Sequence, residues 1–313
     1  MKKSPKIFYT YEQQIEHLRG KKLVIENDAE ARDILQRYSY YACVSAYKDI
    51  FKEAPNGNYK PGTSIRHIMA LYEFDADLRN RFLRYILMVE NHIKSLYSYS
   101  FCQLYGDREM CYRSRVNYDY ARNPAGVDKL LGIFKEQIEN PQQNYVKYNH
   151  ETYGEVPLWV LIHSLTLGNL SNMYALSLPK LQSEIAKKIG SKAVFSNHLI
   201  AMLSVLTKFR NTCAHNERLY SYRTKDSIED MPVHADLKIG RPKGRYRCGK
   251  NDLFSVVICL KYLLPQKEFA VFAAELKNMM VGYQGIWGDV IFTDIRKKMG
   301  FPPNWYSIVS LHL

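Results

Sequence analysis

The chain of 313 residues is 46% hydrophobic, which is ordinary for a globular protein and ample for a buried core. It carries 44 lysines and arginines against 31 aspartates and glutamates, a formal net charge of +13. This surplus favours nucleic acid as a partner over an anionic membrane, although a merely soluble basic protein can have the same composition.

Cysteine usage and hydropathy indicate the cellular compartment. The six cysteines show neither a C-x-x-C spacing nor a small-domain disulfide framework, so we expect reduced thiols. The N-terminus leads into polar sequence and not into an apolar signal region. The most apolar run, 253–264, is too short to span a membrane and is interrupted by Lys261. We therefore expect a cytoplasmic protein that does not enter a membrane.

The N-terminal part of the chain predicts two helices followed by a break. Thr10 and Gln13 have the spacing of a capping box, which opens a helix that stops near Gly20. Asn27 begins a second helix. The proline- and glycine-rich stretch 55–62 then interrupts any regular element.

Helical periodicity dominates the rest of the chain. Apolar residues recur at three- and four-residue steps most strongly over 75–104, and Gly106 ends this run. Further helices are expected at 65–72, 127–139, from Pro157, 179–189, from Ser196 or Asn197 to Arg210, 252–264 and 268–280. The stretches 107–125, 140–155 and 224–251 are expected to be loops. No alternating run of strand length competes, so the predicted fold is all-α.

The stretch 208–216 carries the strongest candidate chemistry. It follows an apolar helical run and contains Arg210, Asn211 and His215 within six residues. Arginine is a permanent cation that matches phosphate oxygens, and histidine exchanges protons near neutral pH. Together they can cleave RNA without a metal: histidine serves the 2′-OH and the leaving 5′-oxygen, and arginine stabilises the phosphorane. The spacing alone is not distinctive and needs structural context.

The spacing of the motif has two structural consequences. Five residues in a regular helix point Arg210 and His215 to different faces, so the motif works best if the helix loosens at Asn211 and Thr212. In-line cleavage also needs a base and an acid on opposite sides of the phosphate, and a symmetric dimer would supply both from two motifs. The structural alternative is a helix C-terminus at which His215 and Arg218 complement the helix dipole.

Glu90 and Lys94 lie four residues apart in the long predicted helix. One interpretation is an exposed ion pair that contributes only a few tenths of a kcal/mol. The other follows from Val89, which places Glu90 beside the apolar stripe. A partly buried carboxylate there needs a cation, and Arg210 is a candidate. The sequence leaves both interpretations open.

Basic loops are the candidates for further phosphate contacts. The segment 238–250 has six basic residues, no acidic residue and one tyrosine, and its glycines and proline oppose a helix. The RNA-binding candidates are Arg218, Tyr220, Lys238, Arg241, Lys243, Arg245, Tyr246, Arg247 and Lys250. The loop 105–122, rich in tyrosine and arginine, is a weaker candidate. The alternative in each case is a solvated loop.

Other chemistries lack the motifs that they require. The sequence contains no P-loop, no dinucleotide glycine fingerprint, no H-E-x-x-H and no G-x-S-x-G. The histidines are scattered, so no spacing supports a metal site. We therefore expect neither a metal nor a cofactor.

Seven short segments follow one another in a distinctive order. They are 38–41 (YSYY), 74–79 (FDADLR), 90–94 (ENHIK), 156–159 (VPLW), 167–170 (LGNL), 210–220 (RNTCAHNERLY) and 299–305 (MGFPPNW). Together they resemble the abortive-infection AbiD/AbiF-like (Abi-like) family of the HEPN superfamily. The resemblance covers nearly the whole chain.

The resemblance implies a helical-bundle HEPN core with an R-(N/H/D)-x-x-x-H ribonuclease motif, which here reads Arg210, Asn211 and His215. It also implies dimers that cut RNA without metal in bacterial antiphage defence, and for some members a structured non-coding RNA partner. On this basis we expect one compact unit over 1–313. Its expected parts are a HEPN core at about 64–105 plus 156–223, an N-terminal helical extension at 1–62, an insertion at 106–155, and a basic loop with C-terminal helices at 224–313.

The sequence therefore predicts a homodimeric, metal-independent endoribonuclease that leaves 2′,3′-cyclic phosphate and 5′-OH ends. His215 is the predicted general acid/base, Arg210 the phosphate clamp and Asn211 an orienting residue or second donor. Glu90 and Lys94 are predicted supporting residues. Two alternatives from other classes are a non-catalytic RNA-binding protein and a purely structural helical protein.

Overall fold

The computed structural model describes residues 7–55 and 57–311, and over these ranges it contains helices and no β-strand, which confirms the all-α fold. The α-helices are α1 (Tyr11–Gly20), α2 (Asp28–Tyr38), α3 (Ile65–Tyr105), α4 (Glu109–Tyr112), α5 (Pro124–Glu139), α6 (Asn144–Tyr153), α7 (Leu158–Leu161), α8 (Leu167–Ala175), α9 (Pro179–Ile189), α10 (Ser196–Ala214), α11 (Pro232–Asp236), α12 (Leu253–Leu263) and α13 (Gln266–Lys298). The π-helical turn η1 (Tyr40–Ser45) and short 3₁₀ turns connect some of them.

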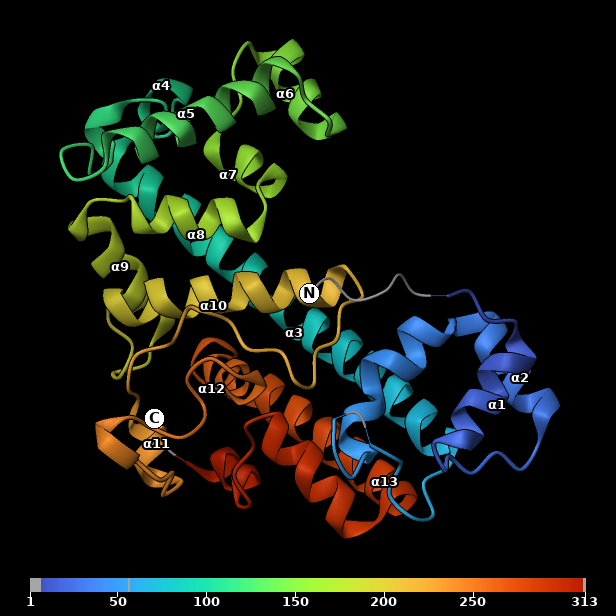
Figure 1. Cartoon of the computed structure of the whole chain (residues 1–313). Coiled ribbons are helices and arrows are strands. Elements are labelled where there is room, and N and C mark those ends of the chain that lie inside the picture. Colours follow the sequence, from blue (N-terminus) through green and yellow to red (C-terminus); the bar gives the residue numbers. More distant parts are fainter. Residues whose placement is uncertain (1–6, 56, 312–313) are drawn as a thin grey trace, which may run out of the picture.

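The long helix α3 runs through the middle of the molecule, and the other elements pack around it (Figure 1). It contacts α10, α13, α9 and α7. Its fully buried stripe recurs every three or four residues, as the sequence pattern predicts, at Leu78, Phe82, Ile86, Val89 and Ile93. One cluster of buried apolar side chains extends from Ile15 to Ile308, so the elements share a core. The division into core, extension and insertion stays a prediction.

The helix α3 is continuous where the sequence predicted two helices, 65–72 and 75–104. The Ser64 backbone N–H donates to Nδ1 of His67, 3.1 Å away, at the start of the helix. Phe74 and Asp75 are fully buried within the helix, which has neither glycine nor proline to break it. Gly106, with φ 98°, ends it as predicted.

Helix caps near the N-terminus match the sequence. The backbone N–H of Gln13 donates to Thr10 Oγ1 at 3.3 Å, and the Thr10 N–H donates to Gln13 Oε1 at 2.9 Å, which confirms the capping box. The Asn27 side chain accepts from Ala29 and Glu30 at the start of α2. Figure 1 shows α1 and α2 near the beginning of α3, and α4 to α7 near its other end.

Three predicted loops contain helices, and one predicted helix end is wrong. The stretch 107–125 contains α4, and the stretch 224–251 contains α11. The stretch 140–155 contains α6, whose only buried residue in the described chain is Val146, so it offers no apolar stripe for the sequence pattern to reveal. The last α-helix extends to Lys298 and not to about 280. It bends at Gly288, which has φ 73° and lies in a glycine-rich stretch that resembles a helix end.

Candidate functional site

The candidate site lies where α10 packs against α3. Arg210 is in the last turns of α10, and Glu90 and Lys94 are on α3. Lys94 Nζ is 2.8 Å from Glu90 Oε1, and Arg210 Nε is 4.0 Å from Glu90 Oε2. The side chains of Glu90 and Lys94 are each 6% exposed, and that of Arg210 is 30% exposed. Glu90 is therefore a buried carboxylate between two cations, and the interpretation as an exposed ion pair is wrong.

The contact between Glu90 and Arg210 is incomplete. Oε2 of Glu90 and Nε of Arg210 are buried, and neither has a hydrogen-bond partner. Their separation of 4.0 Å is longer than a hydrogen bond. Buried polar atoms without a partner are uncommon, and a catalytic or binding role is one of the explanations for them. Because part of the Arg210 side chain reaches solvent, its outer N–H groups can bind an anion while Glu90 keeps the charge in place.

His215 is the C-cap residue of α10, with φ −92° and ψ 11°. The helix stays regular from Asn211 to Ala214, so the predicted loosening after Arg210 is wrong. Thr212 is buried, and its Oγ1 donates to the Lys208 carbonyl of the same helix at 3.1 Å. In a regular helix five residues correspond to about 140° around the axis. The side chains of Arg210 and His215 therefore leave α10 in different directions.

The side chains of His215 and Asn211 are exposed. Within residues 7–55 and 57–311, neither makes a side-chain hydrogen bond or an ion pair. Both are therefore available to a bound molecule or a second copy of the chain. Asn216, with φ 57°, turns the chain out of the helix in a conformation that asparagine tolerates. This terminal position is also the one that the helix-dipole interpretation of His215 requires.

A second buried carboxylate, which the sequence analysis did not single out, fixes the chain after the motif. Asp75 on α3 is fully buried and accepts hydrogen bonds from the backbone N–H groups of Leu219 at 2.9 Å and Tyr220 at 2.6 Å. It also accepts from Tyr47 Oη at 2.8 Å and from Arg79 at 2.7 Å. Burial raises the pKa of Asp75, and these donors oppose that rise. The spacing of Asp75 and Arg79, four residues apart within the apolar stripe, is the signal that could have identified this pair.

Two residues predicted to bind RNA after the motif have structural contacts. Tyr220 is 2% exposed and stacks on Tyr47 with ring centroids 5.9 Å apart, so the prediction that it contacts RNA is wrong for this structure. Arg218 is exposed, but its guanidinium donates to the backbone carbonyl of Ala46. No local sequence pattern could predict these contacts, because Tyr47 and Ala46 lie more than 170 positions before Tyr220 and Arg218 in the chain.

The basic segment 238–250 is partly neutralised by its own neighbours. Arg241 and Lys250 pair with Asp230 at 2.7 Å and 2.6 Å. The ring of Tyr246 stacks on His234 at 4.7 Å, with the Arg241 guanidinium 4.9 Å from its centroid, so it is not a free stacking surface. Within this segment, the predicted RNA-binding residues that are exposed and have no ion pair to a described residue are Lys238, Lys243, Arg245 and Arg247.

The structure does not bring the basic segment and the motif together. Figure 1 shows α11, next to the basic segment, on a different side of the molecule from the C-terminal end of α10. The predicted site residues therefore fall into two groups. Arg210, Glu90 and Lys94 form one contact, with His215 at the end of the same helix. The basic segment forms another surface.

The described residues do not form a reactive thiol at the motif or a metal site. Cys213 lies within the motif, and burial raises the pKa of its thiol to about 12, so it is not a thiolate at neutral pH. No group of three or more histidine, cysteine, aspartate or glutamate residues in the described chain is arranged to hold a metal ion. Among the described helices, none has the length and apolar character needed to cross a membrane.

Comparison with known proteins identifies the family. The fold and site define an all-α protein in which a buried glutamate of the longest helix faces an arginine near the end of a second helix. A family model described as Abi-like protein matches residues 33–221, and the chain belongs to this family. This membership connects the protein with abortive infection. No curated protein and no solved structure matches the chain.

Proposed function

We propose that the protein is a metal-independent HEPN-type endoribonuclease that acts on RNA in the cytoplasm during abortive infection. One observation carries the proposal: a buried oxygen of Glu90 without a hydrogen-bond partner lies 4.0 Å from Nε of Arg210. Arg210 belongs to α10, the helix that ends at the exposed His215. A permanent cation held by a buried carboxylate, with an exposed imidazole at the end of the same helix, suits phosphodiester cleavage.

Arg210 is the proposed phosphate clamp. Its outer N–H groups bind the non-bridging oxygens and stabilise the negative charge that develops on the phosphorane. Glu90 positions this guanidinium, and Lys94, 2.8 Å from Glu90, balances the second oxygen of the carboxylate. Asn211 is exposed one residue further along α10 and is proposed to orient the RNA or to donate a second hydrogen bond.

His215 is the proposed acid and base, with one copy from each chain of a homodimer. The base takes the proton of the ribose 2′-OH, and the 2′-oxygen attacks phosphorus. The bond from phosphorus to the 5′-oxygen breaks, and the second His215 protonates that oxygen. The products have 2′,3′-cyclic phosphate and 5′-OH ends. A dimer accounts for the different directions in which Arg210 and His215 leave α10.

The first experiment measures RNA cleavage in excess EDTA by the wild type and by the variants His215→Ala and Arg210→Ala. The matched control is His150→Ala, which removes an exposed histidine of α6 outside the site. We expect cleavage by the wild type and the control, and none above background by the two site variants. Undiminished cleavage by His215→Ala, free of contaminating nuclease, contradicts the assignment.

The composite site is tested with mixed dimers. Light scattering establishes the oligomeric state, and two affinity tags isolate dimers with one wild-type and one His215→Ala chain. If both histidines serve one phosphate, the mixed dimer is inactive. A mixed dimer with half of the wild-type rate contradicts the composite site and assigns the chemistry to single chains.

The second candidate function is RNA binding without cleavage. It is favoured by the exposed His215, which no side chain of the described chain orients. RNA extracted from the purified protein and sequenced, beside the cleavage assay, separates the two functions. Recovery of one structured RNA by a protein that cuts neither this RNA nor others supports the second function.

A further inference from the structure

A pocket far from the motif is lined by five basic side chains and no acidic one. It has a volume of about 490 Å³ and lies between the segment 237–248 and the end of α13. The basic residues are Arg223, Lys238, Arg247, Arg296 and Lys297. A hollow of about 340 Å³, lined by Ser221, Arg223, Lys297 and Lys298, shares two of these residues. The pocket has the size of a small-molecule site.

Most of the cations in this pocket have no acidic partner. Within the described residues, Lys238, Arg247 and Arg296 form no ion pair. Lys297 is 3.7 Å from Asp294, but its side chain is 69% exposed, so this pair is weak. The pocket therefore has positive charge that the protein itself does not balance, and such charge attracts an anion.

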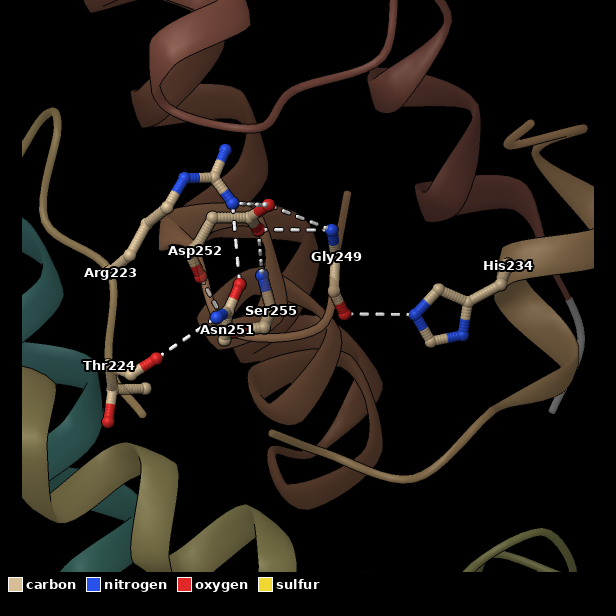
Figure 2. A network of polar contacts seen from close by, with 7 residues as sticks. All are labelled: Arg223, Thr224, His234, Gly249, Asn251, Asp252 and Ser255. Atoms are coloured by element: carbon tan, nitrogen blue, oxygen red, sulfur yellow. Dashed lines mark hydrogen bonds and ion pairs between the residues drawn. The ribbon is translucent and has the colours of Figure 1, made fainter. Parts of the chain in front are cut away.

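The buried carboxylate Asp252 pairs with Arg223, one of the five pocket cations (Figure 2). Its two oxygens accept from the Gly249 backbone N–H at 3.0 Å and 3.1 Å, and one accepts from the Ser255 N–H at 3.2 Å. Arg223 donates to it at 3.2 Å. Since these donors occupy the carboxylate, Asp252 holds Arg223 in position and leaves the other pocket cations without a counterion.

The wall of the pocket is fixed by close backbone packing. Gly300 has φ 82°, and a Cβ atom there would lie 2.2 Å from the carboxyl carbon of Asp252, so only glycine fits. Asn304 Nδ2 donates to the Leu237 carbonyl at 3.1 Å, which ties the segment after α13 to the basic segment. On the other side of Asp252, the Gly249 carbonyl contacts His234 Nε2 at 2.9 Å (Figure 2).

The same segment supplies an apolar surface. Phe301 is 3% exposed and lines the pocket together with Pro302, Pro303 and Ile239. Phe301, Pro302 and Pro303 belong to the G-F-P-P-N-W stretch, for which the catalytic proposal has no role. Pro303, which is exposed, can pack against a ribose or a base while the neighbouring cations bind a phosphate.

We propose that this pocket binds a nucleotide, with its phosphate on Arg247, Arg296 and Lys238 and its ribose or base against the wall around Pro303. The nucleotide is either one unit of a bound RNA or a free mononucleotide. The inference goes beyond the proposed cleavage function and does not depend on it, because the pocket shares no residue with the Arg210–His215 motif.

The test measures binding to full-length protein from which co-purified RNA has been removed at high salt. Isothermal titration calorimetry uses four probes: adenosine 5′-monophosphate, adenosine, inorganic phosphate and an octanucleotide. The octanucleotide has 2′-deoxyribose at every position, so that it cannot be cut. We expect saturable binding of the mononucleotide or the octanucleotide, and weaker binding of phosphate and of adenosine. Binding of the mononucleotide assigns the pocket to a free ligand, and binding of the octanucleotide alone assigns it to RNA.

Charge reversal at the pocket identifies the binding site. Arg247→Glu and Arg296→Glu are each expected to weaken nucleotide binding by at least about tenfold, because each removes a charge-assisted contact and adds repulsion. The matched control is Lys267→Glu, an exposed lysine of α13 outside the pocket. Melting temperatures establish that the variants are folded, which is expected since Arg247 and Arg296 have no ion pair to lose.

The proposal is overturned if neither adenosine 5′-monophosphate nor the octanucleotide binds. It is equally overturned if inorganic phosphate binds as tightly as adenosine 5′-monophosphate. It is also overturned if Lys267→Glu weakens binding as much as Arg296→Glu. His215→Ala is expected to bind the nucleotide like the wild type. Loss of cleavage in that variant and loss of binding in the pocket variants are therefore separate outcomes.

Discussion

Two buried carboxylates on α3 differ in how completely they are satisfied. Asp75 and Glu90 each have a cation four residues further along, at 2.7 Å for Arg79 and 2.8 Å for Lys94. Asp75 receives three further hydrogen bonds, from one tyrosine hydroxyl and two backbone N–H groups. Glu90 has one buried oxygen without a partner, 4.0 Å from Arg210 Nε.

We infer that this difference separates a structural site from the proposed functional one. A carboxylate that receives many fixed donors holds the backbone in one conformation, and in this protein it holds the segment that follows the motif. A carboxylate that leaves a nearby arginine without a hydrogen bond gives that arginine freedom to engage a ligand. The predictions below test this distinction, beginning with the largest expected effect.

The largest effect is expected at the motif. His215→Ala and Arg210→Ala should each lower the rate of RNA cleavage by about a thousandfold, since they remove proton transfer and charge stabilisation. The melting temperature should change little, because His215 is exposed and Glu90 keeps Lys94 as its partner. Single-turnover kinetics and thermal unfolding of the same preparations check both parts. A large loss of stability in either variant would indicate that the motif, like Asp75, has a structural role.

Asp75→Asn should destabilise the protein by about 3–5 kcal/mol, because Arg79 remains buried without its counterion. The measurement is urea unfolding. The matched control is Asp77→Asn on the same helix, where a half-buried carboxylate accepts one hydrogen bond from Tyr283 at 3.1 Å. The control should lose about 1 kcal/mol. Equal losses in the free energy of unfolding for the two variants would contradict the structural role proposed for Asp75.

Double substitutions should distinguish the two pairs more sharply. Glu90→Leu leaves Lys94 buried and unpaired and should cost about 3 kcal/mol, and the addition of Lys94→Met should recover most of it. Asp75→Leu with Arg79→Met should not recover, because the backbone N–H groups of Leu219 and Tyr220 lose their acceptor.

The rate of RNA cleavage is the second property to measure in the Glu90→Leu/Lys94→Met double variant. Glu90→Leu/Lys94→Met should be stable but at least about tenfold slower than the wild type, since Arg210 has lost the charge that positions it. Wild-type activity in this stable variant would show that Glu90 has no positioning role.

The smallest effect concerns His234, a third buried polar side chain that is satisfied like Asp75. In the neutral tautomer with the proton on Nε2, His234 donates to the Gly249 carbonyl at 2.9 Å and its Nδ1 accepts from the Met231 N–H at 3.0 Å. Burial lowers the pKa of His234 from its ordinary value of 6.5. Below pH 6.5 the unfolded chain therefore binds a proton that the folded chain does not, and the free energy of unfolding falls by up to about 1.4 kcal/mol per pH unit.

Residue-specific detection is needed for this prediction, because burial raises the pKa of Asp252 to about 6, which stabilises the fold as the pH falls through that value. An NMR titration of the His234 ring should show a midpoint below that of the same histidine in urea-unfolded protein. A midpoint at or above the unfolded value would contradict the neutral, buried assignment.

Much of the fold follows from local signals in the sequence. The Thr10 capping box, the Asn27 cap and the apolar stripe of α3 each depend on residues within a few positions of one another, and the structure contains all three. Local signals fail where tertiary contacts decide. The helix α6 forms on a polar stretch, and α13 continues through a glycine-rich stretch, for which the sequence pattern predicted a loop and a helix end.

The site shows the same limit. The approach of Arg210 to Glu90 was one of two interpretations that the sequence left open, because an apolar stripe indicates burial but not the partner. The contacts of Asp75 with Leu219 and Tyr220 join residues more than 140 positions apart, so no local pattern reveals them. For the same reason Tyr220, which follows the motif closely, was predicted to face RNA although it is buried against Tyr47.

The chemistry of the cut RNA ends tests the central claim most directly. RNA cleaved by the wild-type protein in EDTA should have 5′-OH and 2′,3′-cyclic phosphate ends, and a single 2′-deoxynucleotide at the cleavage position should block the cut. The same analysis of His215→Ala should detect no such ends. Ends with 3′-OH and 5′-phosphate, or cyclic phosphate ends formed at the wild-type rate by His215→Ala, would contradict metal-independent cleavage by the Arg210–His215 motif.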